Sequence, residues 1–162
     1  MSKYLSIIIL NVNRLNAPVK RYIVAEWIRK RDPHIHCLQE THLRKKDLQN
    51  LKVNGWKKYW KHVDRGKKAG VAILIWDKID FKMKAIKRDT EGQFIILKGR
   101  IHQEDLNIEN VYAPNIGAPK YIKKTLENFK KVIDCNTVIL KDFNIPLWKR
   151  KDLPNKIATR IL

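Results

Sequence analysis

The sequence predicts an α+β fold in which two β-sheets pack face to face and helices lie outside them. A strand–helix–strand pattern occurs at each end of the 162-residue chain, and a run of short strands separated by turn residues lies between them. Hydrophobic residues make up 44% of the sequence, which is enough for the core of one domain. We therefore expect a single β-sheet core with an antiparallel meander in its middle.

The expected strands fall into two kinds. Continuous apolar runs rich in β-branched residues are typical of buried strands, whereas several segments of the meander alternate apolar and polar residues with a period of two. Turn residues such as glycine and aspartate separate the meander strands. The expected strands cover residues 4–10, 34–40, 56–63, 70–76, 81–87, 93–99, 106–112 and 137–143.

Two helices are expected, one near each end of the sequence. The first covers residues 18–32, because Pro18 suits a first helical position and apolar residues follow at helical spacing. We expect its apolar stripe to face the sheet, with Val19, Ile23 and Trp27 in line and Val24 and Ile28 beside them. The second covers residues 120–134, with a stripe made of Ile122, Leu126, Phe129 and Ile133. A short helical turn is expected around residues 47–51.

The net charge limits the kinds of molecule that the protein is expected to bind. Thirty-five Lys and Arg residues against sixteen Asp and Glu residues give a net charge of +19. Such a surface attracts polyanions, which are DNA, RNA or an anionic membrane face. No apolar stretch is long enough to span a bilayer, and the apolar run near the N-terminus is predicted to be a strand rather than a signal peptide.

The cysteines and histidines give little sign of metal binding. Cys37 and Cys135 lie in apolar runs far apart in the sequence, which favours free buried thiols in a reducing compartment, that is, the nucleus or cytoplasm. No Cys/His cluster has the spacing of a zinc site. We expect surface or packing roles for the histidines at positions 34, 36, 62 and 102, and core positions for Trp56, Trp60 and Trp76.

Polar residues follow four of the expected strands, and together they suggest a site. These residues are Asn11 and Asn13, Glu40 and Thr41, Tyr112, and Asp142 and Asn144. Side chains at the ends of core strands meet at one rim of a sheet, where a rigid scaffold can hold them. Two carboxylates with several amides suggest a hard cation such as Mg²⁺, which binds oxygen ligands and keeps waters for a substrate phosphate.

Each of these residues also has a simpler interpretation. Asn11 and Asn13 could cap or turn the chain before the first helix, and Glu40 could be an exposed charge at a strand end. The segment from Asp142 to Asn144 could form an Asx turn, and Tyr112 could pack in a loop rich in proline and glycine. The segments taken one by one leave these alternatives open.

Five motifs in order resemble the endonuclease/exonuclease/phosphatase superfamily, which includes DNase I, exonuclease III and the apurinic/apyrimidinic endonucleases. The motifs are "LNVNRLN", "CLQETHL", "KKAGVAIL", "VYAPNIGAP" and "DFNIPL". More narrowly, the chain resembles the endonuclease domain of the reverse-transcriptase polyprotein of mammalian long interspersed elements (LINE-1). The resemblance implies a DNase I-like β-sandwich with flanking helices, of which residues 1–147 form the N-terminal portion. Residues 148–162 are then a basic C-terminal tail.

The resemblance also implies roles for the rim residues and a cofactor, Mg²⁺ or Mn²⁺. Glu40 matches the glutamate that ligates the cation, and Asn11 the asparagine that helps to bind metal and phosphate. Tyr112 matches a tyrosine that contacts the phosphate. Asp142 matches the aspartate that positions or deprotonates the attacking water, and Asn144 its amide partner. Contacts to DNA phosphates are expected from Asn13, Arg14, Thr41 and Lys68.

The chain departs from the family pattern in three places. Lys141 and Arg14 stand where the family usually has glycine, a residue that often marks a positive φ. The family continues through further strands to a terminal "SDH" motif with a catalytic histidine, and this sequence has no such motif. We therefore expect a truncated copy in which the two helices cover one face of the first sheet. The other face would stay an exposed apolar surface through which chains could associate.

Three functions follow from these observations. The first is a Mg²⁺-dependent DNA endonuclease that nicks one strand for target-primed reverse transcription, with activity impaired by the missing segment. The alternative is a catalytically dead, basic remnant that binds nucleic acid. A lipid or inositol phosphate phosphatase of the same fold is disfavoured by the net charge and by the motif match.

Overall fold

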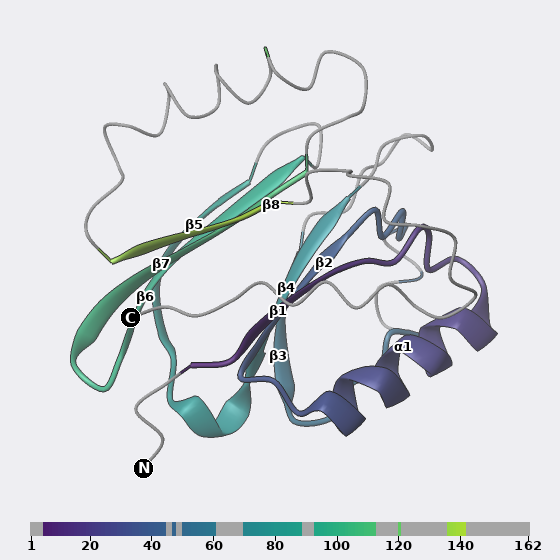
Figure 1. Cartoon of the computed structure of the whole chain (residues 1–162), viewed down its shortest axis with the longest axis horizontal. Coiled ribbons are helices and arrows are strands. Elements are labelled where there is room, and N and C mark those ends of the chain that lie inside the picture. Colours follow the sequence, from purple (N-terminus) through teal and green to yellow (C-terminus); the bar gives the residue numbers. More distant parts are fainter. Residues whose placement is uncertain are drawn as a thin grey trace.

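The computed structural model describes residues 5–44, 47, 50–60, 70–88, 93–112, 120 and 136–141. These residues form two four-stranded sheets, one α-helix and a short 3-10 helix (Figure 1). Apart from Lys120, the helix expected over residues 120–134 lies outside the described residues, and so does the tail 148–162. The described part of the chain contains no helix that is both long and apolar enough to cross a membrane.

The first sheet, here called sheet A, has the strand order β1-β2-β4-β3. Its strands are β1 (Ile7–Asn11), β2 (Ile35–Gln39), β3 (Trp56–Trp60) and β4 (Val71–Trp76). β1 and β2 are parallel and are joined by helix α1 (Pro18–Arg31), whereas β4 runs antiparallel to both of its neighbours. This parallel pair brings the carboxyl ends of β1 and β2 to the same edge of the sheet.

The second sheet, sheet B, has the strand order β5-β6-β7-β8. Its strands are β5 (Lys82–Arg88), β6 (Phe94–Ile101), β7 (Glu104–Val111) and β8 (Thr137–Lys141), and a 3-10 helix, η2 (Asp77–Ile79), leads into it from β4. β5, β6 and β7 form an antiparallel meander, and β8 is parallel to β7. The prediction of an α+β fold with two facing sheets is confirmed.

The core between the sheets follows from the alternation of side chains along each strand. Every second residue of sheet A points at sheet B, and the two faces form one buried cluster. From sheet A it contains Ile7, Ile9, Ile35, Cys37, Val71, Ile73 and Ile75, and from sheet B Ile95, Leu97, Ile101, Leu106, Ile108 and Leu140. Cys37 is a free, buried thiol as predicted, and burial raises the pKa of this thiol above its usual range.

The prediction that one face of the first sheet stays exposed, and could mediate association, is wrong. That face is the one buried against sheet B. The physical reason is that the chain turns through η2 after β4 and begins a second sheet, so the later meander strands supply the missing cover. Both faces of sheet A are therefore covered within the described chain, one by sheet B and the other by α1.

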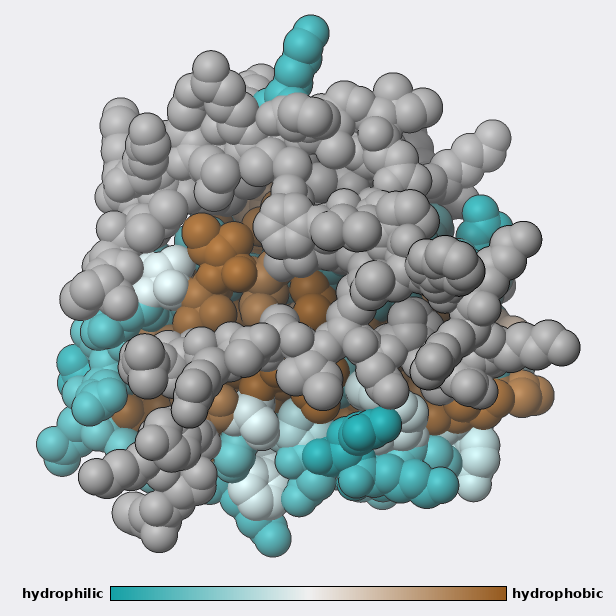
Figure 2. Space-filling view, in the orientation of Figure 1, coloured by the Kyte–Doolittle hydropathy of each residue, from teal (hydrophilic) through white to brown (hydrophobic). Residues whose placement is uncertain are grey.

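Helix α1 covers the second face of sheet A, but with a different side from the expected one. The buried residues of α1 are Arg21, Val24, Ala25 and Ile28, whereas Val19 and Ile23 are 70% and 47% exposed. Arg21 takes the sheet-facing position of the first turn because its guanidinium donates hydrogen bonds to two carbonyls of the preceding loop. Figure 2 shows hydrophobic surface at the right-hand end of the molecule, where α1 begins.

The remaining aromatic predictions agree with the packing. Trp56 is buried in the cluster under α1, and Trp60 and Trp76 are half-buried against both clusters. His36 is fully buried and meets the edge of the Trp27 ring, with 5.5 Å between ring centres. His34 Nδ1 accepts a hydrogen bond from the backbone N–H of Ser6, which directly precedes β1. These residues therefore pack the fold, as the sequence suggests.

Candidate functional site

The candidate site lies at the edge of sheet A where β1 and β2 end. The loops after these strands run side by side, held by backbone hydrogen bonds from Val12 N–H to Gln39 O (3.0 Å) and from Arg14 N–H to Glu40 O (2.7 Å). Because Asn11 and Gln39 are direct partners in the parallel ladder, Asn11 and Glu40 stand at neighbouring strand ends. The structure thus brings together the two residues predicted to hold the cation.

The backbone at this edge is unusual. Asn13, Arg14, Glu40 and His42 all have a positive φ, with values of +43°, +70°, +53° and +49°. Asparagine and histidine adopt this region more often than arginine and glutamate do, and a non-glycine residue held there costs about 1–3 kcal/mol of strain. Arg14 stands where the resembling family usually has glycine, so the expected need for a positive φ at this position is confirmed. Strained residues of this kind cluster at functional sites.

Thr41 and Gly70 meet under the same edge. The Thr41 N–H donates to Gly70 O (3.2 Å), and a Cβ at Gly70 would lie only 2.8 Å from Thr41 Oγ1. Gly70 also has a φ of +73°, so the approach of β4 to the loop after β2 requires glycine. The Thr41 residue is 4% exposed and packs in this contact. Its role at a phosphate stays a prediction.

Two buried amides join sheet A to sheet B beside the site. Gln39 Nε2 donates to Asn110 Oδ1 (3.0 Å) and to Val111 O (2.9 Å). In turn Asn110 Nδ2 donates to Leu38 O (3.0 Å) and to Ala72 O (2.9 Å). Both side chains are fully buried, and the four hydrogen bonds satisfy both amide nitrogens and the Asn110 oxygen, whereas Gln39 Oε1 has no hydrogen-bond partner among the described residues. We call this pair the amide clasp.

The amide clasp fixes where Glu40 and Tyr112 stand. Glu40 follows Gln39 directly, and Tyr112 follows Val111, whose carbonyl accepts one of the clasp's hydrogen bonds. Tyr112 is half-buried, packs against the core between the sheets and donates its N–H to Gln93 O (2.7 Å). Packing therefore accounts for part of the Tyr112 side chain. The site combines the end of β2 in one sheet with the end of β7 in the other.

Asn11 behaves as a turn residue. Its Oδ1 accepts a hydrogen bond from the Asn13 N–H (3.0 Å), which confirms the turn interpretation of this pair. An amide oxygen can accept more than one partner, so a turn hydrogen bond of this kind does not by itself exclude a role as a metal ligand. The two interpretations of Asn11, turn and ligand, are compatible.

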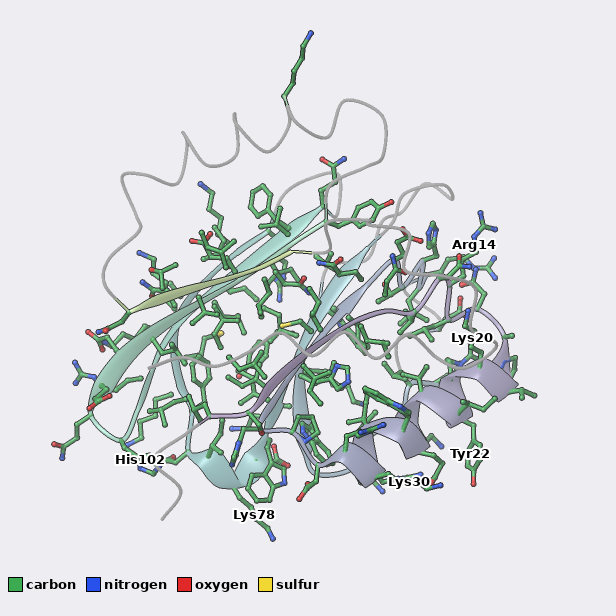
Figure 3. All side chains as sticks on the ribbon, viewed as in Figure 1. Arg14, Lys20, Tyr22, Lys30, Lys78 and His102 are labelled. Carbon is green, nitrogen blue, oxygen red and sulfur yellow. The ribbon has the colours of Figure 1, made fainter. Side chains whose placement is uncertain are left out.

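Positive charge gathers beside Glu40. Arg14 is exposed, and Lys20 Nζ donates to Asn13 O (2.5 Å); Figure 3 shows both cations at the same end of the molecule. Burial lowers the pKa of His42, and the nearby Arg14 lowers it further, against the opposing effect of Glu40. His42 is therefore neutral at pH 7, and the fixed charge of the rim comes from Arg14 and Lys20.

The rim residues fit a hard cation. Glu40 supplies a carboxylate and Asn11 an amide oxygen, which are ligands that Mg²⁺ and Mn²⁺ accept together with waters. Within the described ranges no group of three or more His, Cys, Asp or Glu residues could hold a metal ion. A cation at this rim would therefore depend on few protein ligands. Asp142, Asn144 and Lys68, the other predicted site residues, lie outside the described residues.

Sequence reasoning missed three buried polar residues that support the site: Arg21, Gln39 and Asn110. Gln39 and Asn110 point into the core between the sheets, at positions where the alternation of their strands calls for an apolar residue. The signal that could have revealed them is a polar residue at a strand position where the alternation expects an apolar one. It shows that a partner is needed but not which residue of the other sheet provides it.

The fold of this chain was compared with known families and with solved structures. No family model matches the sequence. Among solved structures, D. rerio TDP2 in complex with a single-stranded DNA product matches with a TM-score of 0.65 and 14% identity, covering 86% of this chain and 60% of that one. An AP endonuclease from Archaeoglobus fulgidus matches with a TM-score of 0.61 and 19% identity, covering 80% and 52%. A mannosyl-6-phosphatase from Bacteroides thetaiotaomicron matches with a TM-score of 0.65 and 15% identity, covering 86% and 65%.

These similarities establish the fold. The chain has the two-sheet architecture of endonuclease/exonuclease/phosphatase proteins, as the motifs suggest. It spans between about half and two thirds of the length of the solved structures that it matches.

Proposed function

We propose that this chain belongs to a divalent-metal-dependent phosphodiesterase that nicks DNA, of the kind found in the polyproteins of long interspersed elements. The observation that carries the proposal is the amide clasp. It holds Glu40 and Tyr112 at one rim of a sandwich whose structural relatives include an AP endonuclease and a DNA-bound TDP2. The net charge of +19 supports a polyanionic substrate.

Each residue has a task in this proposal. A cation held by Glu40 and Asn11 would neutralise charge that develops on the scissile phosphate. Arg14 and Lys20 attract the DNA backbone to the rim, and Tyr112 contacts the phosphate. Hydrolysis also needs a base for the attacking water and an amide beside it, and the resemblance assigns these tasks to Asp142 and Asn144.

DNA binding without hydrolysis is the second candidate, and the excess of cations favours it as strongly as it favours the first. Binding of this kind is electrostatic and nearly independent of sequence. If about five phosphates are neutralised, log K falls with log salt at a slope of roughly −4 to −5. In both cases we propose that the protein works inside the cell, in the nucleus or cytoplasm, which the free buried thiol of Cys37 supports.

Nicking of supercoiled plasmid separates the two candidates. We expect Mg²⁺-dependent nicking that Glu40→Ala lowers by about 10²-fold or more, because the variant loses the main cation ligand. Glu104→Ala is the matched control, since Glu104 is exposed in the β6–β7 hairpin, and it should nick like the unmodified chain. Binding in EDTA should survive in both variants.

Equal nicking by the two variants would contradict the role of Glu40. Salt-dependent DNA binding without nicking, in the presence of Mg²⁺ or Mn²⁺, would establish the second candidate instead.

A further inference from the structure

The outer face of sheet B, the face turned away from sheet A, carries a row of cations. The inward residues of β6 are those in the core between the sheets, among them Ile95 and Leu97, so Lys98 and Arg100 point outward. Residues directly opposite in an antiparallel pair share a face, and Lys82 is opposite Arg100. The ladder therefore identifies which side chains of β5 share this outer face.

The outward cations form one continuous group, here called the basic stripe. It consists of Lys82, Lys84, Lys87, Lys98 and Arg100. Lys84 lies at a bulge in β5, and its place on the outer face follows from its ion pair with Asp105, which is opposite Arg100. Every residue of β5 except Ile86 is exposed, and the Lys82 side chain is 74% exposed.

Two exposed carboxylates pair with the basic stripe. Asp105 accepts from Lys84 Nζ (2.7 Å) and from Arg100 Nε (2.9 Å), and Asp80 lies 3.9 Å from Lys82. These two hydrogen bonds lower the pKa of Asp105 to about 2, so it stays ionised and holds Lys84 and Arg100 side by side. Counted over the described residues alone, five cations face two exposed carboxylates on this side of the sheet, which is an excess of positive charge.

A third carboxylate on this side of the sheet is buried. Glu109 on β7 is only 1% exposed, and burial raises the pKa of its carboxyl, against the opposing effect of the nearby Lys98. Even when Glu109 is counted as ionised, the cations of the stripe outnumber the carboxylates that face them.

The need to protect an open sheet edge does not explain the whole stripe. β5 is an edge strand of sheet B (Figure 1), and lysines on an edge strand oppose pairing with other chains. Lys98 and Arg100, however, lie on β6, which is paired on both sides. Edge protection does not account for the charge on these two residues, of which Arg100 pairs with Asp105 and Lys98 lies near Glu109 on the neighbouring strand.

The stripe leads toward the candidate site. Arg88, at the end of β5, is opposite Ile95, and the next residues along the ladder are Phe94 opposite Val111, directly before Tyr112. Lys82 marks the opposite end, so along β5 the stripe runs from Lys82 to Lys87, roughly 17 Å for five residue steps.

We propose that the basic stripe is a second DNA-binding surface, which holds backbone phosphates of a DNA segment that extends beyond the candidate site and along the exposed strand β5. The choice of DNA as the polyanion rests on the proposed function. The interaction itself is electrostatic, reads no base sequence and requires neither a metal ion nor hydrolysis.

Binding of labelled duplexes in EDTA, followed by fluorescence anisotropy, tests the stripe. The stripe variant is Lys82→Gln, Lys84→Gln, Lys87→Gln. The control variant, Arg29→Gln, Lys30→Gln, Lys52→Gln, removes the same charge from exposed positions on α1 and the loop packed beside it, on the sheet A side. Duplexes of about 8 and about 24 base pairs separate binding at one surface from binding that occupies the rim and the stripe together, because the shorter spans only roughly 27 Å and cannot reach along the stripe while it is bound at the rim.

We expect the stripe variant to bind the long duplex about ten-fold or more weakly and the short one less than about two-fold more weakly. Its salt slope on the long duplex should become shallower by about 0.9 for each phosphate that the variant no longer neutralises. The control variant should change either affinity by less than about two-fold. Replacement of the same three lysines by arginine should keep the affinity, which shows that the charge and not an altered fold is responsible.

Equal reductions in affinity for the two glutamine variants would overturn the proposal, since net charge alone would then account for binding. An unchanged affinity of the stripe variant for the long duplex would overturn it as well. Because the measurement needs no cleavage, a chain that binds through the stripe but never nicks DNA would contradict the proposed hydrolase and leave the stripe established.

Discussion

Asn110 satisfies three hydrogen-bonding groups inside the core, and this single side chain holds the two sheets in register at the site. Its amide donates to two carbonyls of sheet A, and its oxygen accepts from Gln39. A buried amide with all partners in place specifies one arrangement of the sheets, because any slip would leave several polar groups unpaired. Glu40 and Tyr112 gain their fixed positions from this requirement.

We expect Asn110→Ala to lower the free energy of unfolding by about 3 kcal/mol or more. The substitution removes one hydrogen bond each from the buried carbonyls of Leu38 and Ala72 and from the Gln39 amide, which keeps its bond to Val111 O, and a buried group left unsatisfied costs about 1–3 kcal/mol. Urea unfolding measures the loss, with exposed Asn54→Ala as the control. A cost below about 1 kcal/mol would show that water or repacking replaces the clasp.

For single residues, the sequence was informative only where the residue type expected at a position indicates the backbone conformation there. The positive φ of Arg14 could be expected, since the family pattern has glycine there. The partners of Gln39 could not, because they lie 71 and 72 residues away and nothing local indicates them. The roles of Asp142 and Asn144 stay predictions.

Helix α1 shows how an amphipathic pattern can mislead about orientation. Val19 and Ile23 continue the apolar stripe of Trp27 in sequence, yet both are exposed, and the buried side is centred on Val24 and Ile28. Periodicity identifies a helix reliably, but apolar residues on two sides leave its rotation open. The hydrogen bonds of Arg21 to the loop before the helix settle that rotation.

Two substitutions on different sides of the helix test the rotation of α1. Ile23→Gln should change the free energy of unfolding by less than about 0.5 kcal/mol, because the side chain is 47% exposed. Ile28→Ala should cost about 2–5 kcal/mol, since Ile28 is fully buried and its truncation leaves a cavity under the helix. Thermal or urea unfolding measures both, and comparable costs would contradict the observed orientation.

For the whole molecule, the sequence predicts two facing sheets but not which strands cover the inner face of sheet A. Alternation in the meander and the apolar runs at either end identify the strands, and the observed bounds differ from the expected ones by only a few residues. Strand order and sheet assignment depend on contacts between distant segments, such as those that bury Ile9, Ile73 and Leu97 in one cluster. For that reason the covered inner face of sheet A could not be inferred from periodicity.

Acid should destabilise the whole fold, in part through His36. Burial lowers the pKa of this histidine from 6.5 to about 3, and neither ring nitrogen has a hydrogen-bond partner among the described residues. Between these two pKa values, His36 is therefore protonated in the unfolded chain but not in the folded chain. The stability that neutral His36 allows is fully present above pH 6.5 and falls as pH drops toward 3.

Between pH 6.5 and about pH 4.5 we expect His36 to contribute a loss of about 2 kcal/mol in the free energy of unfolding. Urea unfolding across this range, compared with His36→Leu, isolates the contribution, because the leucine variant should show a flatter pH dependence. Parallel curves for the two proteins would mean that other groups, or repulsion among the many cations, cause the acid sensitivity.

The amide clasp also bears on the order in which the molecule folds. Its hydrogen bonds close a loop of 71 residues between Gln39 and Asn110, a pairing with a high entropic cost that slow, late steps of folding commonly establish. All four strands of sheet A lie within residues 7–76, whereas the rim that holds both Glu40 and Tyr112 also needs β7, so this rim cannot form before β7 has docked. The site is therefore completed only together with the core between the two sheets.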